Sequence, residues 1–180
     1  MTTKNSNENK EEVNFIRTEL IQEIRKKVKP SSLIFFFLLV LIACTGDTVF
    51  EQHKSFEDQS WNADSAIIFN CLVEDTVSQN QWVIKVRHTV EYEFQNLFLF
   101  IKAEKVDTIE IQLANKEGRW IGRGVGDIRK VDFVYKEKEI FSKKGELVVK
   151  LEQAMRYGDF EKIQQLKNIE SIGFRVEKND

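Results

Sequence analysis

Between residues 48 and 176, apolar residues recur in short stretches, most of which alternate with polar residues. A period of two is typical of a β-strand with one buried face. The stretches lie at 48–56, 65–73, 82–86, 97–101, 109–113, 131–135, 147–151 and 172–176. About eight strands separated by turn residues predict an all-β fold, an antiparallel, jelly-roll-like β-sandwich. Residues 65–73 are almost continuously apolar, so we expect that strand to be buried on both faces.

One segment near the C-terminus follows a different period. Phe160, Ile163 and Leu166 recur at the spacing of a helix, which predicts one short helix over residues 159–168. Before it, the strand pattern stops at Gly158, in a segment that we interpret as a strand end followed by a turn.

A longer apolar run at residues 33–43 precedes the strands. Lysines at positions 26, 27 and 29 lie before it, and it ends in Leu41, Ile42 and Ala43, directly before Cys44. A basic segment, a short apolar segment and a small residue at the cut form a secretory signal. With the cysteine directly after the cut, the segment resembles a bacterial lipobox, and that resemblance implies acylation of the cysteine. As a helix the run would rise about 16 Å, about half of a bilayer core. We therefore expect cleavage before Cys44, with a diacylglycerol and an N-acyl chain on that cysteine.

The signal divides the chain into four segments. Residues 1–32 are a polar extension and basic segment, and 33–43 the apolar segment that is removed. Residues 44–63 carry the acylated cysteine, a tether and the first strand, and 64–180 form the sandwich. Apolar residues between 13 and 28 recur at helical spacing. We interpret residues 1–25 as an extended basic segment or a start site assigned too far upstream; a helix with its own role is the alternative.

Charge and cysteine content narrow the class of protein. Seven of the 27 basic and five of the 29 acidic residues precede residue 44, so the remaining chain has a net charge of −4. A domain without a basic surplus is not expected to bind nucleic acid. Cys71 lies within an apolar run, and a lone cysteine there is expected to be a small buried residue.

The glycine-rich stretch 118–127 is the main candidate for a binding site. Its glycine spacing matches neither dinucleotide-binding nor P-loop patterns, so nucleotide binding is not expected. Glycine at such positions more often marks a bulge or a close approach of two backbone segments. Arg119, Trp120 and Arg123 belong to the residue types that dominate protein interfaces, so we expect them to form a protein-docking surface if the loop is exposed.

No pattern in the sequence indicates catalysis or a metal site. His53 and His88 are far apart and have no ligand partners at metal-binding spacing, and we expect His88 to be half-buried and hydrogen-bonded. Neither a catalytic serine motif nor a defined pair of carboxylates can be recognised. We therefore expect no catalytic residues, no metal ligands and no cofactor. A surface on which sugar rings stack is an alternative role for the three tryptophans, Trp61, Trp82 and Trp120. The alternation around Trp82 nevertheless favours a core position for that residue.

Several stretches together resemble the GldH family, gliding-motility lipoproteins of Bacteroidetes-type bacteria. The resemblance runs from Cys44 to near the C-terminus and is densest at residues 85–89, 95–100, 114–128, 152–156 and 169–178. The chain departs from the family at residues 1–25 and at 90–94, where members tend to carry a Tyr-Pro turn. No catalytic residues transfer from the family, and only Cys44 transfers as a site.

The resemblance implies a non-catalytic cell-envelope lipoprotein needed for surface gliding. Its partners would be the membrane, through the lipid anchor, and other gliding-motility envelope proteins; we expect it at the outer membrane, facing the periplasm or the cell surface. A docking role in the gliding or secretion machinery fits the strand-rich domain. A glycan-binding surface lipoprotein is the alternative, and a lipid-anchored hydrolase is a third reading that would need two facing carboxylates in a cleft.

Overall fold

A computed structural model describes residue 15 and residues 17–19, 47–159 and 161–179. The chain divides into two units, Met1–Gly46 and Asp47–Asp180. In the first unit, residues 15 and 17–19 are helical, and they lie within the stretch where the sequence has helical spacing. The predicted signal, including Leu41, Ile42, Ala43 and Cys44, lies outside the described residues. No helix in the described part of the chain is long and apolar enough to cross a bilayer.

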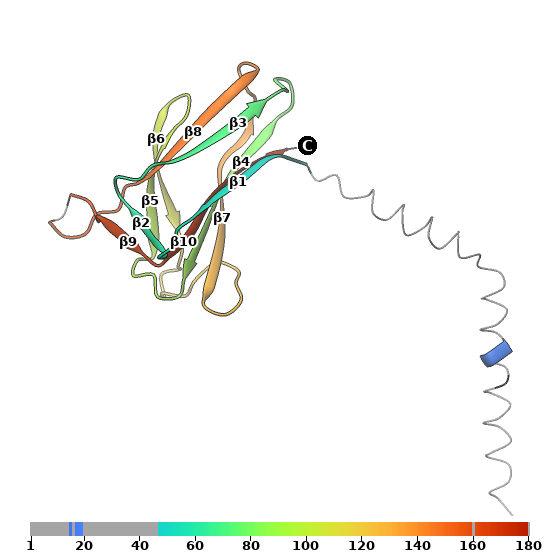
Figure 1. Ribbon diagram of the computed structural model, residues 1–180, viewed down its shortest axis with the longest axis horizontal. Coiled ribbons are helices and arrows are strands. Elements are labelled where there is room, and N and C mark those ends of the chain that lie inside the picture. Colours follow the sequence, from blue (N-terminus) through green and yellow to red (C-terminus); the bar gives the residue numbers. More distant parts are fainter. Residues whose placement is uncertain (1–14, 16, 20–46, 160, 180) are drawn as a thin grey trace, which may run out of the picture. The chain divides into compact units, whose positions relative to one another are not determined.

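The described residues of the second unit form ten strands (Figure 1). They are β1 (Thr48–Ser55), β2 (Ser60–Asn62), β3 (Ile67–Val73), β4 (Asn80–Thr89), β5 (Asn96–Lys102), β6 (Val106–Gln112), β7 (Ile128–Glu139), β8 (Gly145–Gln153), β9 (Gln165–Lys167) and β10 (Ile169–Lys178). One four-stranded sheet has the order β1-β10-β4-β7 and the other has the order β3-β8-β5-β6. The strands β2 and β9 form a separate pair, and every paired strand is antiparallel to its neighbour. The predicted all-β, antiparallel class is confirmed.

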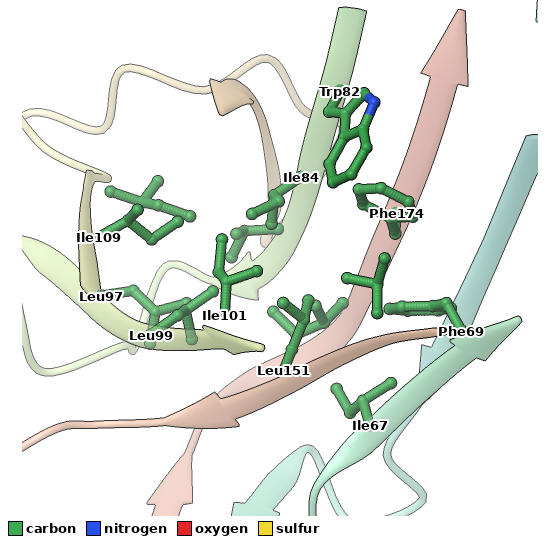
Figure 2. Close-up of a cluster of buried hydrophobic side chains, with 14 of the residues drawn as sticks. Ile67, Phe69, Trp82, Ile84, Leu97, Leu99, Ile101, Ile109, Leu151 and Phe174 are labelled. Carbon is green, nitrogen blue, oxygen red and sulfur yellow. The ribbon is translucent and has the colours of Figure 1, made fainter. Parts of the chain in front are cut away.

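The core lies between the two four-stranded sheets. Figure 2 shows side chains of β3, β5 and β8 facing Trp82, Ile84 and Phe174 of β4 and β10. The Trp82 ring meets the Phe174 ring edge-on at 5.5 Å between centroids, and Phe69 stacks on Phe174 at 5.9 Å. Aromatic pairs of this geometry add to the free energy gained by burying apolar area. Trp82 and Cys71 are fully buried, as their sequence environment predicted.

The helix predicted over residues 159–168 is wrong. Within that segment the described residues include the strand β9, which pairs with β2 through Leu166 opposite Trp61. Leu166 is buried, whereas Ile163 is only half-buried, so the apolar residues do not share one buried helical face. The backbone oxygen of Ile163 instead accepts a hydrogen bond from Gln153 Nε2 at 2.6 Å. Contacts with distant strands override the local spacing.

Two further expectations change. The domain has ten strands rather than about eight, because β2 and β9 span three residues each and are too short to show a period. The strand β3 is buried on one face only, with Ile68 and Leu72 exposed, because only the inner face of its sheet packs against the other sheet. The strand β1 pairs along its length with β10.

Candidate docking surface

The glycine-rich loop, residues 113–127, joins β6 to β7 and begins with a tight turn. The Asn115 side-chain oxygen accepts hydrogen bonds from the backbone N–H groups of Glu117 and Arg119, at 3.1 and 2.8 Å. This side-chain bond fixes the turn, as asparagine commonly does. Arg119 is exposed at the turn, while Trp120 is half-buried and its ring lies 4.7 Å from that of His88.

The middle of the loop runs against the edge of β7. Arg123 and Lys130 exchange two backbone hydrogen bonds, at 3.0 and 2.7 Å. A Cβ atom on Gly122 would lie 2.6 Å from the Lys130 carbonyl oxygen, and one on Gly124 would lie 1.9 Å from that of Ile128. The close backbone approach expected from the glycines is therefore confirmed at Gly122 and Gly124. The loop covers one edge of the first sheet and presents Arg123 and Val125 to solvent.

His88 supports the loop from inside the domain. Its side chain is fully buried, and Nδ1–H donates to the Thr89 carbonyl oxygen at 2.9 Å. Nε2 has no hydrogen-bond partner among the described residues. Burial lowers the pKa of His88, the Thr89 bond opposes this shift, and the Arg129 charge adds to the lowering. His88 is hydrogen-bonded as expected, but it is fully rather than half-buried.

A groove of about 750 Å³ lies on the outer face of the first sheet, beside the loop. We call it the outer groove. It is lined by Glu51, His53, Lys85, Arg87, Arg123, Gly124, Val125, Ile128, Lys130, Ser171 and Gly173. The strand register places Gly173 of β10 between His53 of β1 and Lys85 of β4. Because glycine has no side chain, a hollow remains between two strands that carry long side chains.

Ion pairs order the charged side chains in and around the groove. Lys85 pairs with Glu51, Arg87 Nη2 lies 3.2 Å from Glu170 Oε1, and Lys130 Nζ lies 3.3 Å from Asp132 Oδ2. The hydrogen bond from Lys85 lowers the pKa of Glu51, and the charges of Lys85, Arg175 and Lys130 lower it further. The neighbouring cations therefore stabilise the ionised carboxylate of Glu51.

The structure separates the three residues predicted for docking. Arg123 lines the outer groove, Arg119 is exposed on the turn outside it, and Trp120 faces His88. Sequence analysis missed Lys85, Arg87, Lys130 and His53 as groove residues. Part of this groove could have been predicted from β4, because Lys85 and Arg87 alternate with apolar residues and therefore lie on the same face of the strand.

The structure also bears on the predicted sugar-binding, metal-binding and catalytic candidates. Trp61 and Trp82 are fully buried, so the three tryptophans do not form a sugar-stacking surface. The described residues contain no group of three or more His, Cys, Asp or Glu side chains placed to hold a metal ion. Hydrogen bonds from Lys102 and Lys150 lower the pKa of Glu152. A general acid needs the opposite shift, a raised pKa.

Similarity to known proteins is extensive. The family described as GldH lipoprotein matches residues 48–176. The gliding motility lipoprotein GldH of Flavobacterium johnsoniae is 33% identical over 161 residues, covering 86% of this chain and 99% of the relative. A gliding motility lipoprotein GldH homolog of Christiangramia forsetii is 34% identical over 158 residues, covering 83% of this chain and 96% of the relative.

Among solved structures, the CBM35 of Cellvibrio japonicus Abf62 covers 77% of this chain and 94% of its own at 14% identity. Its TM-score is 0.29, too low to bear on fold or ligand. The sequence matches cover most of both chains, and the family match spans the stretches at 85–89 and 114–128 and most of 169–178. The chain belongs to the GldH lipoprotein family.

Proposed function

We propose that this protein is a non-catalytic component of the gliding-motility machinery, held at the cell envelope by acyl chains on Cys44. The names of its two relatives support the gliding role, and the signal at residues 26–44 supports the anchor. A diacylglycerol and an N-acyl chain bury many methylene groups, each worth about 0.8 kcal/mol, so attachment to the outer membrane would be long-lived. The folded domain then faces the periplasm or the cell surface.

The domain acts by docking another envelope protein at the outer groove and the adjoining loop. One observation carries this proposal. Eight of the eleven groove residues come from the stretches 85–89, 114–128 and 169–178, which are far apart in sequence and carry the family resemblance. Arg123 and Val125 lie within the groove, Arg119 is exposed on the turn of the same loop, and Trp120 is half-buried against His88. Arginine and aromatic side chains are typical anchors of such contacts.

Gliding of cells that carry Val125→Glu tests the docking role. Val125 is 92% exposed, so the substitution changes the groove without disturbing the core. Val77→Glu is the matched control, because Val77 is 82% exposed in the β3–β4 loop and does not line the groove. We expect Val125→Glu cells to lose most of their gliding speed at normal protein level and acylation, and Val77→Glu cells to glide normally. Normal gliding by Val125→Glu cells would contradict the proposal.

A further inference from the structure

The outer groove has the opposite charge sign to the chain that carries it. Residues 44–180 have a net charge of −4, yet the groove lining contains four cations, Lys85, Arg87, Arg123 and Lys130, and one carboxylate, Glu51. A concave surface of one charge sign concentrates ligands of the other sign. The distribution therefore favours an anionic occupant.

These cations can still bind a ligand. Arg123 has no ion pair among the described residues, so its guanidinium keeps its full donor capacity for a carboxylate. Arg87 and Lys130 have partners, but their side chains remain 45% and 43% exposed. Exposed pairs of this kind contribute little stability, so an incoming carboxylate can share the cation with its present partner.

The walls and floor of the groove suit an extended polypeptide. The floor is backbone at Gly173, where a Cβ atom would lie 3.3 Å from both the Gln52 carbonyl oxygen and Lys85 Cβ. On the loop side, Val125 and Ile128 add apolar surface next to Arg123 and Lys130. A phosphate ion or a lipid headgroup would use the cations but not this apolar wall. A peptide with acidic and apolar side chains would use both.

We propose that the outer groove binds an extended acidic segment of a partner protein, whose carboxylates pair with Arg123, Lys130 and Arg87 while an apolar side chain packs on Val125 and Ile128. The proposal rests on the docking function above and adds the chemistry of the partner. Electrostatic complementarity of this kind sets the choice of partner and speeds association more than it raises affinity.

Fluorescence anisotropy with defined peptides tests this chemistry. The full acylated chain in detergent is titrated into a labelled peptide that alternates Glu with Val, and into a matched peptide with Gln in place of Glu. We expect binding only to the Glu peptide, weakened by salt, and at least about fivefold weaker in an Arg123→Gln/Lys130→Gln variant. Lys143→Gln/Lys144→Gln is the charge-matched control, because these exposed lysines follow the other end of β7 and should leave binding unchanged. Equal binding of the two peptides, or displacement of the Glu peptide by inorganic phosphate beyond the effect of an equal ionic strength of chloride, would overturn the proposal.

A photo-crosslinking amino acid at position 53 tests it in cells. His53 lines the groove and is exposed on β1. Mass spectrometry of the crosslinked product should identify a partner segment with an excess of Asp and Glu. A neutral or basic segment, or no crosslink, would overturn the acidic-segment proposal. The docking function itself would fail separately, through normal gliding of the Val125→Glu cells.

Discussion

At the scale of single residues, His88 shows how burial and one hydrogen bond set a chemical state. The ring is packed between Trp120 and Tyr92, at 4.7 and 5.6 Å between centroids, and Arg129 contributes a nearby positive charge. The carbonyl oxygen of Thr89 can only accept a hydrogen bond, so Nδ1 carries the proton and the neutral ring leaves Nε2 bare. In its neutral form, the His88 ring therefore provides a surface on which Trp120 packs.

This state makes stability depend on pH. The folded pKa of His88 lies below the ordinary value of 6.5, so the unfolded chain binds the extra proton first as pH falls. The stabilisation that buried, neutral His88 gives the folded state is complete above pH 6.5. It is lost as the pH drops from 6.5 toward the pKa of His88 in the folded protein. Urea unfolding across this range should show declining stability for the wild type and for His53→Gln, which keeps His88. A His88→Gln variant that declines as steeply as the wild type would contradict this account.

Gly124 makes a second prediction at this scale. A methyl group there would lie 1.9 Å from the Ile128 backbone oxygen, and backbone cannot move aside as a flexible side chain can. We expect Gly124→Ala to lower the free energy of unfolding by about 1–3 kcal/mol, measured by urea titration. Lys116→Ala changes an exposed residue of the same loop and should cost less than about 0.5 kcal/mol. Equal effects of the two substitutions would show that the loop does not press on β7.

At the scale of elements, period-two alternation located the long strands well and failed for short ones. The eight expected stretches all overlap strands. The alternation is clearest in β3, β5 and β8, which bury every second side chain over five or more residues. The strands β2 and β9 each bury one central residue, Trp61 and Leu166, and only pairing between distant segments defines them. The outer groove was unpredictable for a related reason. It depends on the register that places β1, β10, β4 and the loop together, and local sequence does not contain that register.

The pairing of β9 can be tested against the helix that local spacing suggested. A helix would bury Ile163 and Leu166 on one face and make both substitutions to alanine costly. The structure buries Leu166 fully against Trp61 and leaves Ile163 half-buried. We expect Leu166→Ala to cost about 2–5 kcal/mol in unfolding free energy and Ile163→Ala clearly less. Similar costs for the two variants, measured by urea unfolding, would favour the helix.

At the scale of the whole molecule, an acidic strand-rich domain combines a positive groove with the lipoprotein signal that precedes it. In the proposed function, the local reversal of charge sign would restrict which partners can dock. The anchor keeps the domain at a membrane, where its effective concentration toward neighbouring envelope proteins is high. Docking at the membrane would therefore depend on both the lipid on Cys44 and the charge of the groove.

Metabolic labelling with an alkyne palmitate checks the lipid. If the Cys44 thiol is the acylation site, as we propose, the wild-type protein should take up the label, and mass spectrometry should show that it begins at Cys44. A Cys44→Ala variant should lose the label and leave the membrane fraction or remain unprocessed. A Cys71→Ala variant removes the buried cysteine of β3 and should keep the label. Retention of label and processing in Cys44→Ala would contradict the anchor.

In the proposed function, gliding depends on the positive charge of the outer groove. The most direct test of this dependence is the gliding speed of single cells whose chromosomal copy carries Arg123→Gln and Lys130→Gln. Both residues line the groove, and neither is buried, so folding and acylation should match the wild type. We expect strongly reduced speed in these cells and wild-type speed in Lys143→Gln/Lys144→Gln cells. Wild-type speed in the groove variant, at equal protein level and acylation, would contradict it.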